Sequence, residues 1–309
     1  VPNLRFPEFQ GEWVTYKIKD VLSIGNGRDY KHLNNGGIPV FGTGGYMTSV
    51  DECLYDGETT FIGRKGSINK PFYYNGKFWT VDTLFYTHSF NGITPKFTYC
   101  LFQTINWLKY NEASGVPSLS KDTIEKIKIN IPRLEEQNKI AKFMFALDER
   151  IATQNKIIED LKKLKSAIIE MEYSHMTKSI SHIGDFIEQT SKRNKGCVIQ
   201  NVLSVSNSQG FIQQSEQFEN RIVASDNTSN YKIVEKNDFA FNPARINVGS
   251  IARLTTFEKG IVSPMYICFR AKDNLYPEYL DYYFESKHFF TEIQKRLEGS
   301  VRQCLSFDG

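Results

Sequence analysis

The sequence predicts an α+β protein in which two similar domains, mostly antiparallel β-sheet with a few helices, are joined by one long coiled-coil helix. Three observations support this fold class. Short matches recur in the same order in both halves, strand-and-turn patterns fill each half, and a segment without Gly or Pro separates them. We place the first domain at residues 1–132, the helix at 133–177 and the second domain at 178–309.

The two halves are related by a faint internal repeat. Gly66-Ser67-Ile68 recurs as Gly249-Ser250-Ile251, and the segment 94–97 recurs as 276–279. Two further matches keep the same order, residues 81–86 with 262–267 and Gly115 with Gly299. Because all the matches keep one order at a nearly constant separation along the chain, we interpret them as a duplication.

Each half alternates short apolar runs with turn residues. Runs rich in β-branched and aromatic residues, bounded by Gly, Asn and Asp, predict strands. They are Thr59–Ile62, Phe78–Val81 and Leu84–Tyr86 in the first half, and Phe239–Phe241 and Met265–Phe269 in the second. A Pro opens one helical stretch in each half, and the expected helices are Pro95–Tyr110 and Pro277–Leu297.

The linking segment has the pattern of a coiled coil. Pro132 precedes two acidic residues, Glu135 and Glu136, as at a helix start, and neither Gly nor Pro follows before Tyr173. Apolar residues then follow a 4-3 spacing, interrupted by Gln154 and Lys165, that predicts a coiled-coil seam. The seam consists of Ile140, Met144, Leu147, Ile151, Ile158, Leu161, Ile168 and Met171.

Such a seam needs a partner helix, and two alternatives are open. One is self-association through this helix. The other comes from the repeat: Leu119-Ser120 precedes Pro132 and the long helix, whereas Leu305-Ser306 has no such helix after it. We therefore expect the natural chain to continue beyond Gly309 into a second long helix, antiparallel to the first.

The composition of the 309-residue chain is globular, with 40% hydrophobic, 24% charged and 14% aromatic residues. A net charge of +3 permits polyanion binding without requiring it. The five cysteines lie singly, which indicates buried or inert thiols in a reducing compartment. No apolar run approaches the length of a membrane span, so we expect a cytoplasmic protein with no membrane partner.

Motifs for catalysis are missing from the sequence. There is no P-loop, and Asn242-Pro243-Ala244-Arg245 lacks the second Pro and the aromatic residue of an adenine methyltransferase motif. Ser118-Leu119-Ser120-Lys121 fits a Ser-x-x-Lys pattern but has no companion motif, and we interpret it as a capped turn. The five histidines form no ligand set, so we predict no catalytic residue and no metal site.

The helix start resembles that of type I restriction-modification specificity subunits. The hallmark is Ile131-Pro132-Arg133-Leu134-Glu135-Glu136-Gln137, continued by residues 147–151, although family members often have a second Pro where this chain has Arg133. The segment Trp13–Val21 resembles the family's entry into a recognition domain, and His182–Phe186 is its counterpart in the second half. The resemblance covers essentially the whole chain.

The resemblance implies a non-catalytic subunit that binds double-stranded DNA. Each target-recognition domain would read one half of an asymmetric, bipartite site, while the long helix sets the spacing and docks two modification subunits. Restriction subunits with translocase and nuclease activity would complete the assembly. We expect no cofactor in this chain, with S-adenosylmethionine and ATP/Mg on the partner subunits. The alternative is a coiled-coil dimerising scaffold protein that binds no nucleic acid.

The candidate DNA-reading residues are amide, hydroxyl and cationic side chains on expected loops, because these groups can bond base edges or phosphates. In the first domain they are Arg28, Lys31, His32, Asn34, Asn35, Arg64, Lys65, Ser67, Asn69 and Lys70. In the second they are Lys192, Arg193, Asn194, Lys195, Asn227, Ser229, Tyr231, Asn242, Arg245, Asn247 and Ser250. Arg64 and Arg245 are the strongest candidates. The motif Gly63-Arg64-Lys65-Gly66-Ser67 brings side-chain donors and backbone N–H groups together, and we expect them to suit either a phosphate or a guanine.

Overall fold

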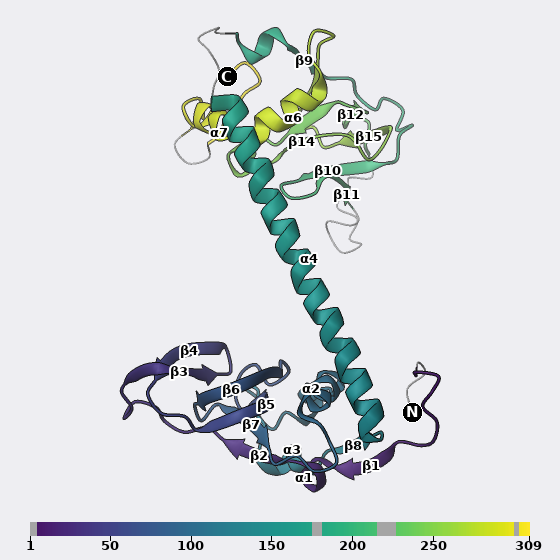
Figure 1. Ribbon diagram of the computed structural model, residues 1–309. Helices are drawn as coiled ribbons and strands as arrows, with labels where there is room; N and C mark the ends of the chain where they lie inside the picture. The colour runs from purple at the N-terminus through teal and green to yellow at the C-terminus, as the bar shows by residue number, and fades with distance from the viewer. Residues whose placement is uncertain (1–4, 175–180, 215–226, 300–302) are drawn as a thin grey trace. The chain divides into compact units, whose positions relative to one another are not determined.

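The computed structural model describes residues 5–174, 181–214, 227–299 and 303–309. It divides into two compact units, Val1–Asn155 and Lys156–Gly309. The division falls inside one helix, α4, which runs from Leu134 to Ser174 (Figure 1). The predicted long helix is therefore confirmed, although its expected end at residue 177 lies outside the described residues. The three predicted domain ranges themselves stay a prediction.

The first unit is built on a six-stranded sheet in the order β2-β7-β5-β6-β3-β4. Only β3 and β6 pair in parallel, and every other neighbouring pair is antiparallel. A separate antiparallel pair joins β1 to β8. The strands are β1 (Val14–Lys17), β2 (Ser23–Asn26), β3 (Asn35–Gly42), β4 (Gly45–Val50), β5 (Tyr55–Gly63), β6 (Phe72–Thr80), β7 (Leu84–His88) and β8 (Lys128–Ile131).

Short helices cover the core of the first unit. They are α1 (Ile18–Val21), α2 (Pro95–Thr104), the 3-10 turn η1 (Trp107–Tyr110) and α3 (Lys121–Lys126). The single helix predicted for residues 95–110 is wrong, because Ile105 is extended and ends α2. Trp107 explains the break: its ring is buried, and its Nε1 donates to the Phe102 carbonyl at 2.9 Å, so that carbonyl is satisfied without a further helical turn.

The second unit has two four-stranded sheets, in the orders β11-β10-β15-β12 and β14-β13-β16-β9. Their strands are β9 (Ile187–Thr190), β10 (Val202–Ser206), β11 (Gly210–Gln213), β12 (Lys232–Glu235), β13 (Phe239–Phe241), β14 (Ile251–Arg253), β15 (Lys259–Val262) and β16 (Ile267–Ala271). Two 3-10 turns, η2 (Ile183–Asp185) and η3 (Ile246–Val248), precede β9 and β14 respectively. The two predicted strand regions, 239–241 and 265–269, correspond to β13 and β16.

The helices of the second unit are α6 (Pro277–Glu285) and α7 (Lys287–Gln294). The continuous helix predicted for residues 277–297 is wrong, because Ser286 is extended and separates the two. Its hydroxyl accepts the backbone N–H of Phe289 at 3.2 Å, which is the capping bond expected at a new helix start. The break lets α7 bury Phe289 and Ile293 in the same core as Phe284 of α6.

Strand order confirms that the two units are similar. The order β2-β7-β5-β6 of the first unit is repeated as β9-β16-β13-β14 in the second, with antiparallel neighbours in both. The parallel pair β3–β6 corresponds to β10–β15: Val40 pairs with Trp79, and Val202 pairs with Ile261. Trp79 lies two residues before the segment 81–86 and Ile261 one residue before the segment 262–267, and the sequence repeat matches these two segments to each other.

Most of the predicted seam on α4 is exposed. Seam side chains from Met144 to Ile168 have exposed fractions between 39% and 59%, so a large part of their apolar surface is accessible. Ile140 differs, because it is partly buried against the core of the first unit. The helix itself is therefore established, whereas its pairing in a coiled coil stays a prediction.

Two further expectations concern cysteines and membranes. All five cysteines are unpaired; Cys268 is buried, Cys53 is exposed and the other three are partly buried, so the expectation of buried or inert thiols is met by burial only at Cys268 and stays a prediction elsewhere. Burial raises the pKa of the Cys268 thiol to about 12, which makes it unreactive. Within the described residues, no helix is both long and apolar enough to cross a bilayer.

Candidate DNA interface

The start of α4 is fastened to the first unit by Gln137. Its side chain is fully buried, and its Nε2 donates to the carbonyls of Gly92 and Pro132, both at 2.9 Å. Its Oε1 accepts the backbone N–H of Thr94 at 2.9 Å. The amide therefore satisfies three backbone groups in the two segments that lead into α2 and α4. This geometry explains why Gln occupies this position in the hallmark of the helix start.

Glu136, the preceding residue, fastens the N-terminal segment to the same helix. Its carboxylate accepts both Nε and Nη2 of Arg5, at 2.7 and 2.6 Å, and Nε1 of Trp13 at 3.3 Å. The Arg5 hydrogen bonds lower the pKa of Glu136 against the opposing effect of burial. Arg5 and Glu136 thus form a bidentate, charge-assisted ion pair at the start of α4.

The loop between β5 and β6 carries Arg64, and its backbone is hydrogen-bonded to two other segments of the first unit. The N–H groups of Arg64 and Lys65 donate to the Thr83 carbonyl, and that of Gly66 donates to the Pro117 carbonyl at 2.8 Å. The expectation that these N–H groups face a phosphate or a guanine is therefore wrong. Gly63 is required for the close packing, since a Cβ there would lie 2.6 Å from the Ser67 carbonyl oxygen.

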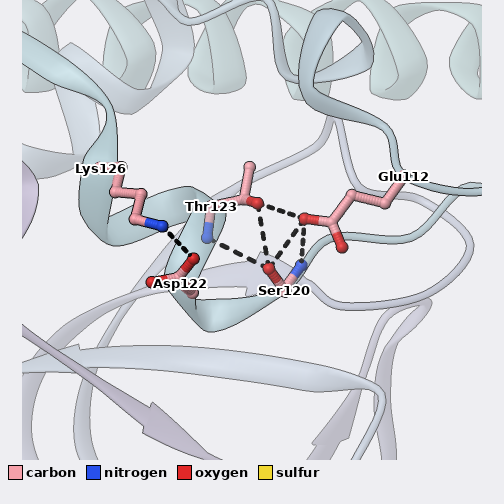
Figure 2. A network of polar contacts seen from close by, with 5 residues as sticks. All are labelled: Glu112, Ser120, Asp122, Thr123 and Lys126. Carbon is pink, nitrogen blue, oxygen red and sulfur yellow. Dashed lines mark hydrogen bonds and ion pairs between the residues drawn. The ribbon is translucent and has the colours of Figure 1, made fainter.

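The segment that supports this loop is itself fixed by a polar network around Ser120 (Figure 2). Ser120 caps α3 by accepting the Thr123 backbone N–H at 3.1 Å, and its hydroxyl donates to Glu112 at 2.8 Å. The Thr123 hydroxyl also donates to Glu112, and Lys126 pairs with Asp122 on the exposed side of the helix. The interpretation of residues 118–121 as a capped turn is confirmed.

The side chain of Arg64 is partly exposed next to this scaffold. Its Nη1 donates to the Asp82 carbonyl at 3.3 Å, and its guanidinium lies 6.0 Å from the ring centre of Phe85. These contacts orient the group and leave its remaining N–H donors without a hydrogen-bond partner within the described residues. Lys65, Ser67, Asn69 and Lys70 on the same loop are exposed.

The other candidate segment of the first unit runs between β2 and β3. Arg28, Lys31 and His32 are exposed, and the Arg28 carbonyl accepts Nε1 of Trp79 at 2.9 Å. The Asn34 amide donates to Asp51 at 3.0 Å, so this side chain is already engaged within the chain. Asn35 is exposed, but it begins β3 and does not lie on the loop where it was expected.

A hollow of about 790 Å³ opens beside these two loops. Its lining comes from the segment after β2, from the turn between β3 and β4, and from the turn between β6 and β7, and includes Asp29, Lys31, Thr43, Met47, Asp82 and Thr83. Of these residues only Lys31 was predicted from the sequence. The others come together because β3 and β6 pair in parallel, so that both adjoining turns meet at one edge.

In the second unit the loop between β13 and β14 carries the corresponding candidates. Gly66 and Gly249 both have left-handed φ angles, of 86° and 88°, consistent with equivalent loops. Arg245 is exposed and Asn247 is half-buried. Asn242 and Ser250 are buried, and the Asn242 Oδ1 accepts the Ala244 backbone N–H at 3.1 Å. Their assignment as exposed DNA-reading residues is therefore wrong.

The remaining candidates lie in two segments of the second unit. Lys192, Arg193 and Lys195 are exposed, with Arg193 donating to Asn230 at 3.2 Å. Asn194 is 2% exposed and uses its amide to bond Ile199 and Thr228, which rules it out as a reading residue. Tyr231 is also buried, whereas Asn227 is exposed and accepts the Ser229 backbone N–H at 3.0 Å.

The sites of both units share one chemistry. Cationic and amide side chains project from loops that tight backbone hydrogen bonds hold in place, and such groups bind anions and base edges. In the described part of the chain, no three His, Cys, Asp or Glu residues are placed to hold a metal ion. Two repeated α+β units on one long helix, each presenting such loops, define a class of proteins with paired recognition domains.

The comparisons with known proteins identify the family. The model of the type I restriction modification DNA specificity domain matches residues 10–163, which include most of the first unit and most of α4. The chain belongs to this family of type I restriction-modification specificity proteins. The matched family and the fold class of the structure therefore agree with the resemblance found in the sequence.

Individual relatives give the same result. The chain is 31% identical over 144 residues to the type I restriction enzyme MjaVIII specificity subunit of Methanocaldococcus jannaschii, covering 44% of this chain and 32% of that protein. It is 30% identical over 147 residues to a putative type I specificity subunit of Mycoplasma pneumoniae, covering 44% of this chain and 48% of that protein. The matches thus span about a third to about a half of the length of these relatives.

A solved structure supports the fold. The S subunit of the type I restriction-modification system from M. genitalium matches with a TM-score of 0.68 at 15% identity, over 99% of this chain and 84% of that one. At this identity the likeness establishes the fold, and the DNA site of this chain must be argued from its own residues.

Proposed function

We propose that this chain is the DNA-reading subunit of a type I restriction-modification complex and performs no chemistry itself. Each unit reads one half of an asymmetric, bipartite duplex target. The length of α4 sets the spacing between the half-sites, and α4 docks two modification subunits that use S-adenosylmethionine. Restriction subunits that use ATP and Mg²⁺ complete the assembly.

The observation that carries this proposal is a repeated strand order with different side chains at equivalent loops. Arg64 follows Gly63 directly after β5, whereas in the second unit Asn242 and Pro243 follow β13 and Arg245 comes later. A common scaffold with divergent reading loops is what an asymmetric target requires, since sequence is read by side chains at base edges.

Salt-dependent binding to duplex DNA tests the proposal. Cations that neutralise phosphates release counterions, so the binding constant of a DNA-reading protein falls steeply as salt rises, by about 10³-fold or more between 50 and 200 mM for six to ten contacts. The combined variant Lys65→Gln and Lys70→Gln is expected to flatten this slope. The control, Lys162→Gln on the exposed surface of α4, is expected to leave it unchanged. A wild-type chain that shows no binding and no slope would overturn the proposal.

The exposed apolar side chains of α4 favour a second candidate, a scaffold protein that dimerises through this helix. The same measurement separates the two, because a scaffold has no reason to release counterions from DNA. Co-purification with an adenine methyltransferase is a further outcome expected only of the specificity subunit.

A further inference from the structure

Acidic side chains line part of the hollow in the first unit, and the attraction of a positively charged surface to DNA phosphates does not explain them. Asp29 and Asp82 both line it, beside Lys31. The Asp29 carboxylate accepts the Lys31 backbone N–H at 3.4 Å. The Asp82 side chain is exposed, and its carboxylate has no hydrogen-bond or ion-pair partner within the described residues. It is therefore ready to accept hydrogen bonds from a ligand.

Only some groups on DNA can satisfy such a carboxylate. An ionised carboxylate accepts hydrogen bonds and donates none, and a phosphate also only accepts and carries the same charge. The donors on base edges are exocyclic amino groups, and in the major groove these are N4 of cytosine and N6 of adenine. A carboxylate beside a DNA-reading loop therefore weakens binding in general and can strengthen it only at a matching base.

The walls around Asp82 are already ordered. The Thr43 hydroxyl donates to that of Thr83 at 3.3 Å and joins the two turns across the hollow. The Asp82 carbonyl accepts Nη1 of Arg64 at 3.3 Å, so the position of the arginine is coupled to the backbone of the turn. These contacts fix the backbone of the turn that carries Asp82 beside the Arg64 guanidinium, so an acceptor and a donor lie next to each other, as the reading of adjacent base edges requires.

We propose that the hollow is a base-reading pocket in which Asp82 accepts the exocyclic amino group of a cytosine or an adenine of the first half-site. Arg64 reads or positions the neighbouring part of that half-site. This inference rests on the proposed function, because it needs the first unit to contact base edges.

The second unit offers an internal comparison. Its turn between β15 and β16, residues 263–266, reads Ser-Pro-Met-Tyr and has no acidic residue. The proposed acceptor is thus specific to the first unit. Removing it changes one half-site and leaves the other intact, which a general electrostatic effect of the charge cannot do.

The experiment selects DNA from a library of randomised duplexes with the full 309-residue chain, followed by sequencing. Wild type is compared with Asp82→Ala, with Asp82→Ser, which copies Ser263 of the second unit, and with the control Glu52→Ala, which removes an exposed carboxylate outside the hollow. Both Asp82 variants are expected to lose about 10-fold preference at one base pair of one half-site. Glu52→Ala is expected to reproduce the wild-type motif.

The source of the amino group follows from the same data. Enrichment of cytosine or adenine at the affected position identifies the base whose amino group Asp82 accepts. If a C·G pair is enriched, inosine in place of its guanine removes only the minor-groove amino group and is expected to leave binding unchanged, whereas lost binding would contradict a major-groove contact. An unchanged motif in both Asp82 variants, with a wild-type motif present, overturns this inference alone. A wild-type chain that enriches no motif overturns the proposed function instead.

Discussion

Gln137 accepts the backbone N–H of Thr94 at 2.9 Å, and through this bond the first turn of α4 is joined to the first turn of α2. The same side chain donates to two backbone carbonyls, so one buried amide completes three backbone groups. This is the physical basis of the Gln in the hallmark of the helix start: Gln137 fixes where the long helix leaves the first unit.

Replacement of Gln137 by Ala is expected to destabilise the first unit by about 3 kcal/mol, because it leaves buried backbone groups without partners. All three tryptophans, Trp13, Trp79 and Trp107, lie in this unit, so tryptophan fluorescence during urea unfolding reports on it alone. The exposed neighbour Asn138 provides the control, and Asn138→Ala should leave the midpoint unchanged. Equal midpoints for both variants would contradict the role assigned to Gln137.

The Arg5–Glu136 pair predicts a pH dependence. Hydrogen bonds from Arg5 lower the pKa of Glu136 in the folded state, so the pair stabilises the fold above the unfolded carboxyl pKa and loses its effect as pH falls through the folded pKa. Arg5→Ala is therefore expected to lower the urea midpoint of the first unit at pH 7, since it leaves a buried carboxylate unpaired.

The same variant should approach wild type in acid. Once Glu136 is protonated there is no charge left to compensate, and the difference in unfolding free energy should shrink below about pH 4. Tryptophan fluorescence at a series of pH values measures this. Glu135→Gln, which removes an exposed carboxylate in the same turn, serves as the control. A difference that stays constant from neutral pH into strong acid would show that Arg5 acts through packing alone.

Arg64 and Arg245 are expected to act on different half-sites. Arg64→Ala should reduce base discrimination about 10-fold at the first half-site only, and Arg245→Ala should do so at the second only. Sequencing of methylated sites in the complex reconstituted with modification subunits would measure this. Lys126→Ala, whose amine pairs with Asp122 on the exposed side of α3, is the control. A uniform loss at all sequences would assign the arginine to phosphate contacts.

The exposed seam of α4 predicts self-association of the isolated chain. Ile158 and Leu161 are 48% and 59% exposed, and burying them against a second helix removes apolar surface from water. The double variant Ile158→Lys and Leu161→Lys is therefore expected to sediment as a monomer at concentrations where wild type associates. Thr153→Lys, on another face of the helix, adds charge without interrupting the seam. Wild type that is monomeric at all concentrations contradicts this prediction.

The sequence was sufficient for the repeat and the long helix, because both depend on local patterns. The duplication is visible in the parallel strand pairs β3–β6 and β10–β15, in which Val40 pairs with Trp79 and Val202 pairs with Ile261. Candidate site residues were harder to predict. Asn194 and Asn242 are buried amides that bond their own loops, and in sequence such residues are indistinguishable from exposed loop amides that could read DNA.

The hollow was not predicted for a different reason. Thr43 and Asp82 lie far apart in the sequence and meet only because β3 and β6 are parallel neighbours, a long-range pairing that no local pattern indicates. The breaks at Ile105 and Ser286 were missed because a side chain, the Trp107 indole or the Ser286 hydroxyl, replaces a helical bond there.

The length of α4 leads to the final prediction. Removal of residues 152–158 deletes one heptad, so the seam continues in phase while the helix shortens by about 10 Å. If the helix sets the spacing between half-sites, the unread spacer should shorten by about three base pairs, given about 34 Å per turn of DNA, with both half-sites unchanged. Replacing residues 153–158 by alanines, next to the native Ala152, keeps the length and should keep the spacer. Methylated-site sequencing distinguishes the outcomes: an unchanged spacer after the deletion would mean that partner subunits, and not α4, determine the separation.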